Sequence, residues 1–136
     1  MAIKAKIKWT DDLQFVATTE KGPAVVMDVP DGGTGPSPME MLLFGVAGCT
    51  AVDVVSILKK KRLNLADFFI DITGERAEKE PKRFTKIRIE YHIVGKGITE
   101  KAVEQAIELS ETKYCSAMAS VNAEFESTYT ITEPET

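Results

Sequence analysis

The sequence has few of the residues that build metal centres and disulfide scaffolds. Its 136 residues include two cysteines and one histidine, and the two cysteines, Cys49 and Cys115, lie far apart. A structural zinc site usually takes four ligands from Cys, His and acidic side chains. Small secreted domains held by disulfides contain more cysteine than this chain. We therefore predict no metal, no cofactor and no permanent structural disulfide.

The sequence also lacks a basic excess and an apolar leader. The formal net charge is -4, which argues against nucleic acid as a partner. The local row Lys4, Lys6 and Lys8 alternates with apolar residues and fits the solvated face of a strand. The first residues enter this pattern without the apolar region of a signal peptide. We expect a cytoplasmic protein.

One long apolar segment, from Met39 to Leu58, has the length of a membrane span. Glu40, Asp53 and two glycines, Gly45 and Gly48, interrupt it, and an acidic residue inside a span is costly. We therefore predict a buried helix of a soluble protein, with no membrane partner. Each glycine costs about 1 kcal/mol of helix propensity relative to Ala, which suggests that another backbone approaches closely.

Both ends of this helix carry local signals. Ser37, Pro38 and Glu40 form a capping box with proline at the first helical position. Lys59 to Arg62 place positive charge at the other end, where the helix dipole is negative.

Alternating apolar residues predict six strands, and a second helix is capped by Thr99. The strands are expected near 3–9, 13–19, 24–29, 68–77, 87–93 and 125–131. The order β-β-β-α-β-β-α-β indicates an α+β fold, with antiparallel strands around long central helices, in a single domain over 1–136. A single six-stranded sheet covers only one side of the apolar helix. We therefore expect an obligate homodimer with the central helices inside.

The two cysteines allow two interpretations. Cys49 and Asp53 share one helix face, where a charged Asp53 would oppose ionisation of the thiol. Cys115 follows Lys113 and opens a helical turn. By composition alone, both cysteines can be small buried apolar residues. Alternatively, they are a redox pair, which requires a reactive thiolate.

A family resemblance bears on this choice. The stretch G-P-S-P-M-E-M-L-L-F-G-V-A-G-C at 35–49 resembles the signature of the OsmC/Ohr family. The stretch Y-C-S at 114–116 resembles that family's second cysteine motif. The order of strands and helices is similar as well, so the resemblance covers nearly the whole chain. The details are closer to a less characterised OsmC-like branch than to the hydroperoxide reductases.

The resemblance implies an intertwined homodimer with two sites at the subunit interface. It also implies a thiol-dependent peroxidase of oxidative-stress defence that reduces organic hydroperoxides. Cys49 matches the peroxidatic cysteine and Cys115 the resolving cysteine, and a dithiol reductant restores both. Glu40 is a candidate site residue, although the hydroperoxide reductases place their Glu where this chain has Met39. They also use an Arg from the N-terminal strands, and this chain has no Arg before Arg62.

Two other functions suit the same residues. The chain could be a non-catalytic protein that binds a small hydrophobic molecule in an interfacial pocket. It could also be a thiol redox sensor, oxidised once rather than turning over.

Overall fold

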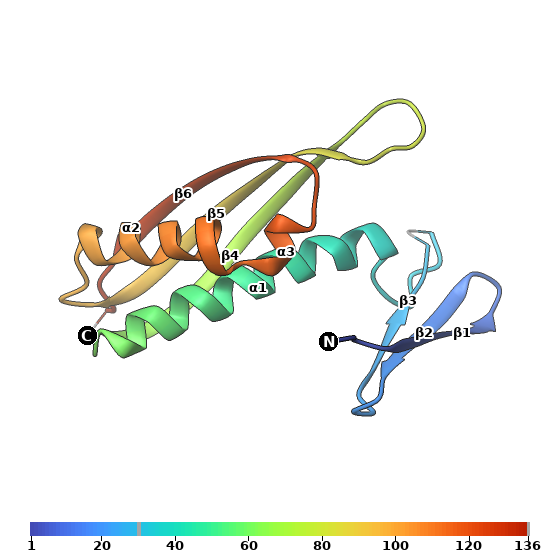
Figure 1. Cartoon of the computed structure of the whole chain (residues 1–136), viewed down its shortest axis with the longest axis horizontal. Helices are drawn as coiled ribbons and strands as arrows, with labels where there is room; N and C mark the ends of the chain where they lie inside the picture. The colour runs from blue at the N-terminus through green and yellow to red at the C-terminus, as the bar shows by residue number, and fades with distance from the viewer. Residues whose placement is uncertain (30, 136) are drawn as a thin grey trace. The chain divides into compact units, whose positions relative to one another are not determined.

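The computed structural model describes residues 1–29 and 31–135 (Figure 1). The chain forms two compact units, Met1–Leu42 and Leu43–Thr136, which are described separately. The mixed α+β class and the predicted order of strands and long helices are confirmed.

The first unit is a three-stranded antiparallel meander, as predicted. It consists of β1 (Ala5–Asp11), β2 (Gln14–Thr19) and β3 (Ala24–Met27), in the order β1-β2-β3. The third strand ends at Met27 and is therefore shorter than the predicted 24–29. Every residue of β1 is exposed, including Ile7 and Trp9. The prediction of a half-buried first strand is therefore wrong for the single chain, because its apolar residues are not covered.

Helix α1 (Pro38–Lys60) begins as the capping signals predict. The Glu40 amide donates to the Ser37 hydroxyl at 3.1 Å, and the Ser37 amide donates to the Glu40 carboxylate at 3.0 Å. By length and composition alone, α1 is apolar enough to cross a membrane. Core helices of soluble proteins meet the same criterion. The buried positions Val46, Thr50, Val54 and Leu58 follow a helical spacing of four.

The second unit contains a separate three-stranded sheet. Its strands are β4 (Asn64–Arg76), β5 (Phe84–Lys96) and β6 (Glu124–Thr132). The pair β4–β5 is antiparallel, but β5–β6 is parallel, with Tyr91 opposite Tyr129. The expectation of antiparallel strands throughout is therefore wrong here. The helical connection between β5 and β6 carries the chain back to the end of the sheet where β5 begins.

Two further details correct the sequence analysis. The strands form two sheets of three in the single chain, not one sheet of six. Residues 64–67, which precede the strand expected at 68–77, are the start of β4. A register shift between Leu65 and Asp67 breaks the alternation there, which hides the strand signal.

Helix α2 (Glu100–Leu109) begins at the predicted cap, because the Thr99 hydroxyl accepts from the Ala102 amide. A π-helical turn, η1 (Ser110–Tyr114), and a short helix, α3 (Ser116–Ala119), follow it. Within the second unit, one face of β5 and the inner faces of α1 and α2 form the core (Figure 1). Its members include Val54, Leu58, Ile87, Ile89, Ile93, Val103 and Ala106.

Candidate functional site

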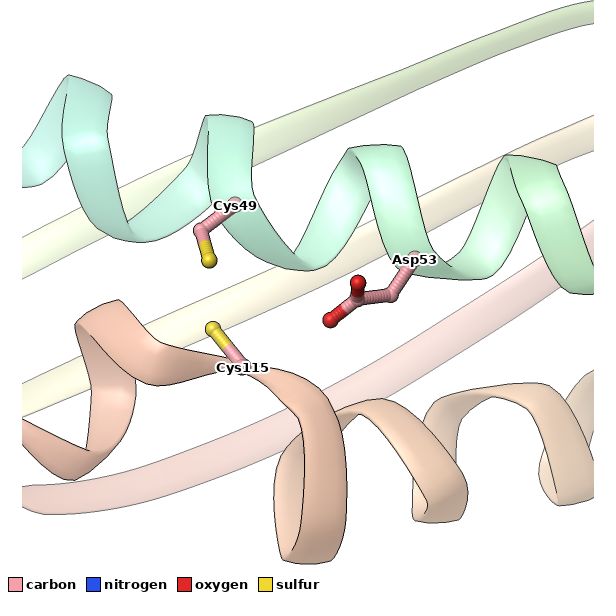
Figure 2. Close-up of side chains that lie close together, drawn as sticks. All are labelled: Cys49, Asp53 and Cys115. Carbon is pink, nitrogen blue, oxygen red and sulfur yellow. The ribbon is translucent and has the colours of Figure 1, made fainter. Parts of the chain in front are cut away.

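The two cysteines lie together in the second unit. Cys49 and Asp53 are one turn apart on α1, so their side chains leave the same face. Cys115 lies between η1 and α3, and its side chain points toward Cys49 (Figure 2). The Sγ atoms of the two cysteines and a carboxylate oxygen of Asp53 are all within 4.8 Å of one another. Both thiols are free, and a small movement would bring them to disulfide distance.

A local break in the helix places Cys115 there. The π-helical turn at Ser110–Tyr114 ends where the Cys115 amide donates to the Ser110 carbonyl at 2.7 Å. Cys115 then adopts an extended conformation, with φ -75° and ψ 94°, and caps α3. Such π-helical turns are rare in proteins, and those that occur often lie at functional sites. The helical turn that Cys115 was expected to open is α3.

The two thiols have different surroundings. Cys115 is 4% exposed, while Cys49 is half-buried. Burial raises the pKa of Cys115 from an ordinary 9.0 to about 11, and nearby Cys49 adds to this rise, against a hydrogen bond from the Met118 backbone. Cys115 is therefore a neutral thiol at neutral pH, and Cys49 is the more accessible of the pair.

A line of buried hydroxyl groups begins at Asp53. Ser110 donates to Asp53 Oδ2 at 2.9 Å, and the Ser110 hydroxyl lies 2.7 Å from that of Thr50. The Thr50 hydroxyl lies 2.8 Å from that of Tyr91, which donates to Glu111 Oε2 at 2.7 Å. No pattern in the sequence predicts this connection. Pairing between strands and helices distant in the sequence creates it, and single polar residues carry no pattern that predicts their partners.

Glu40, the third predicted site residue, lies in the first unit. Its carboxylate accepts a hydrogen bond from the Ser37 amide within the capping box. Hydrogen bonds from the backbone and the side chain of Ser37 lower the pKa of Glu40. The structure therefore gives Glu40 a capping role. Its role in a site remains a prediction.

Two groups of side chains have donors that suit a metal ion. Cys49, Asp53 and Cys115 form one, and Asp71, Glu90 and His92 on the exposed face of the second sheet form the other. In the first, the raised pKa of Cys115 favours the thiol, whereas a metal needs the thiolate. In the second, His92 Nε2 lies 3.1 Å from Asp71 Oδ2, and the His92 ring stacks on Phe69. In the second group, His92 and Asp71 are thus already in contact with each other.

An open depression of about 500 Å³ borders the cysteine site. Asp53 lines it, together with Ile57, Lys60, Leu109 and Tyr114. Asp53, which lies beside both sulfurs, is the residue that the depression and the cysteine site share. Its lining is mixed, with apolar side chains beside a lysine ammonium.

The chain is similar to known proteins in sequence and in fold. The family model described as OsmC-like protein matches residues 31–130. Protein YhfA from Escherichia coli K12 is 40% identical over 114 residues, covering 84% of this chain and 85% of YhfA. The crystal structure of a hypothetical protein from Aquifex aeolicus is 35% identical, with a TM-score of 0.89, and covers 99% of both chains.

A more distant structure shares the fold. The organic hydroperoxide resistance protein OhrB of Bacillus subtilis is 14% identical, with a TM-score of 0.64, over 96% of this chain and 98% of OhrB. The family match and the YhfA relative together show that the chain belongs to the OsmC-like protein family.

Proposed function

We propose that the protein is a cysteine-based peroxidase that reduces organic hydroperoxides in defence against peroxide stress. The observation that carries this proposal is the meeting of Cys49 and Cys115, which are far apart in the sequence and lie within 4.8 Å of one another at their sulfurs. The family supports a role in peroxide stress, since the structural relative OhrB is named for organic hydroperoxide resistance.

The proposed reaction assigns one role to each thiol. The Cys49 thiolate attacks a peroxide oxygen, an S–O bond forms, and the O–O bond breaks. The sulfur loses two electrons, and the alkoxide leaves and takes up a proton to become an alcohol. The Cys115 sulfur then attacks the sulfenic acid of Cys49, which releases water and leaves a disulfide. A dithiol reductant supplies two electrons and two protons and restores both thiols.

The different exposure of the thiols supports this assignment. Cys49 is the half-buried thiol, whereas Cys115 is 4% exposed and its pKa is raised. A resolving cysteine has only to reach the sulfenic acid beside it, whereas a peroxidatic cysteine must meet the substrate. The apolar residues Ile57, Leu109 and Tyr114 beside the site favour an organic hydroperoxide over hydrogen peroxide.

The functional assembly in this proposal is a homodimer in the cytoplasm. Phe44, Gly45, Gly48 and Val52 form an exposed strip along α1, here called the outer strip. Phe44 is 54% exposed and Val52 is 67% exposed. The two glycines between these apolar side chains leave room for close approach, and in this proposal a second copy of the chain covers the outer strip.

The test is steady-state reduction of cumene hydroperoxide and hydrogen peroxide with dithiothreitol. Wild type is compared with Cys49→Ser and Cys115→Ser, and with Tyr129→Phe as a control, since Tyr129 bonds Glu104 outside the site. We expect turnover with preference for the organic peroxide, loss of activity in Cys49→Ser, and stalled turnover in Cys115→Ser.

Turnover no faster than that of the free reductant would overturn the proposal. A single stoichiometric oxidation would then favour a redox sensor. A small hydrophobic molecule found bound by native mass spectrometry, with both thiols inert, would favour a binding protein.

A further inference from the structure

The hydroxyl groups beside the cysteines lie in one continuous line between two carboxyl groups. Four hydrogen bonds join Asp53, Ser110, Thr50, Tyr91 and Glu111, in that order. Thr50, Tyr91 and Ser110 are each 0% exposed, and the two acidic residues at the ends are half-buried. We call this line the hydroxyl chain.

The number of protons in the hydroxyl chain does not match the number of hydrogen bonds. Each of its three hydroxyl groups has one proton to donate, and an ionised carboxylate has none. When Ser110 donates to Asp53 and Tyr91 to Glu111, the single proton of Thr50 must serve two contacts. One contact of 2.7 or 2.8 Å would then join two buried oxygens with no proton between them, which is unfavourable.

One additional proton on either carboxyl group resolves this conflict. With the proton on Asp53, each hydroxyl donates to the next group toward Glu111. With the proton on Glu111, each hydroxyl donates toward Asp53. In both states all four hydrogen bonds have one proton each.

The remaining contacts favour the first state. Glu111 Oε2 accepts from Tyr91 at 2.7 Å and from Ser127 at 2.6 Å, so two donors stabilise a charge there. Asp53 accepts from Ser110, and its carboxylate also faces two sulfur atoms. Burial raises the pKa of Tyr91, so its hydroxyl stays protonated and able to donate.

We propose that the hydroxyl chain holds one proton beyond those of its hydroxyl groups, with Asp53 protonated and the negative charge on Glu111. The consequence concerns Cys49. A charged Asp53 within 4.8 Å would oppose the thiolate, whereas a neutral Asp53 does not. Thr50, Tyr91 and Glu111 are thus positioning residues that keep charge away from the reacting sulfur. The effect of a neutral Asp53 on peroxide reduction rests on the proposed function, whereas the proton count of the hydroxyl chain does not.

The proton count can be tested without any turnover. In reduced protein at neutral pH, infrared spectroscopy separates the C=O stretch of a carboxylic acid from the bands of carboxylates. We expect one such acid band in the wild type, and carbon-13 labelling of the aspartate carboxyl groups should shift it.

Three substitutions give distinct expectations. Thr50→Val leaves the Ser110–Asp53 and Tyr91–Glu111 hydrogen bonds, and the two remaining hydroxyl protons supply both. Tyr91→Phe leaves the Thr50–Ser110 and Ser110–Asp53 hydrogen bonds, again with two hydroxyl protons. Both should therefore lose the acid band. Tyr129→Phe is the matched control, because it removes another Tyr–carboxylate hydrogen bond of 2.7 Å, to Glu104, and it should keep the band.

The rate of Cys49 alkylation by iodoacetamide gives a second readout. It should fall on the order of tenfold or more in Thr50→Val and Tyr91→Phe at neutral pH and stay unchanged in Tyr129→Phe. Absence of the band in the wild type, or its persistence in both test variants, would overturn the proposal. Because peroxide takes no part, an inactive peroxidase that shows the band would refute the proposed function and leave the proton count standing.

Discussion

The substitution Gly48→Ala distinguishes a lone chain from the proposed homodimer by the sign of its effect. Within the described part of the second unit, no atom beyond the helix's own backbone lies within 4 Å of a Cβ added at Gly48. In a lone chain, Ala would therefore only improve helix propensity and stabilise the protein by about 1 kcal/mol. If a second α1 packs on the outer strip, the added methyl is an overpacking substitution, which costs about 1–3 kcal/mol.

The homodimer proposal therefore predicts net destabilisation or a weaker dimer for Gly48→Ala. Light scattering after size-exclusion chromatography gives the mass, and urea unfolding at two protein concentrations gives the free energy of unfolding. Lys101→Ala, on the exposed face of α2, is the control and should leave the mass unchanged. A monomeric wild type that Gly48→Ala stabilises by about 1 kcal/mol would refute the reasoning.

Three further predictions concern stability and thiol ionisation. Ser37→Ala removes the cap of α1 and should cost about 1 kcal/mol in urea unfolding, as should Thr99→Ala at the cap of α2; no loss in either would contradict the capping account. Leu58→Ala removes most of a side chain that is 0% exposed and should lower the free energy of unfolding by about 2–5 kcal/mol. A loss below about 1 kcal/mol would argue against the described core. For Cys115, the pKa of about 11 against an ordinary 9.0 means that the folded state holds its proton longer than the unfolded state. The stability that this thiol contributes is present below about pH 9 and is lost as the pH rises toward about 11. The alkylation of Cys115 in Cys49→Ser should accelerate over the same pH range, and a midpoint of the alkylation rate near about pH 8 would contradict the burial of this thiol.

Local patterns predicted most of the fold. The caps at Ser37 and Thr99 and the alternation through Ile87 to Ile93 depend on neighbours in the sequence, and the structure has them where expected. The start of β4 was missed because a register shift at Leu65 to Asp67 breaks the alternation. The parallel pairing of β6 depends on how a helical connection returns to the sheet, which strand patterns do not specify.

The candidate site was predictable only in part. Cys49 and Asp53 share a helix face by spacing alone, and the family resemblance supplied Cys115. The partners of Asp53 were not predictable, because Ser110 and Glu111 come from η1, Thr50 from α1 and Tyr91 from β5, and only the folded chain brings these elements together.

The most direct test of the central claim is a single oxidation. Fully reduced protein receives one equivalent of cumene hydroperoxide, and its free thiols and linked peptides are then measured by mass spectrometry. The account predicts the loss of two thiols per chain and one peptide pair joined by a Cys49–Cys115 disulfide, with only a Cys49 sulfenic acid in Cys115→Ser. Two unmodified thiols, or disulfides that join Cys49 to Cys49 between chains, would contradict it.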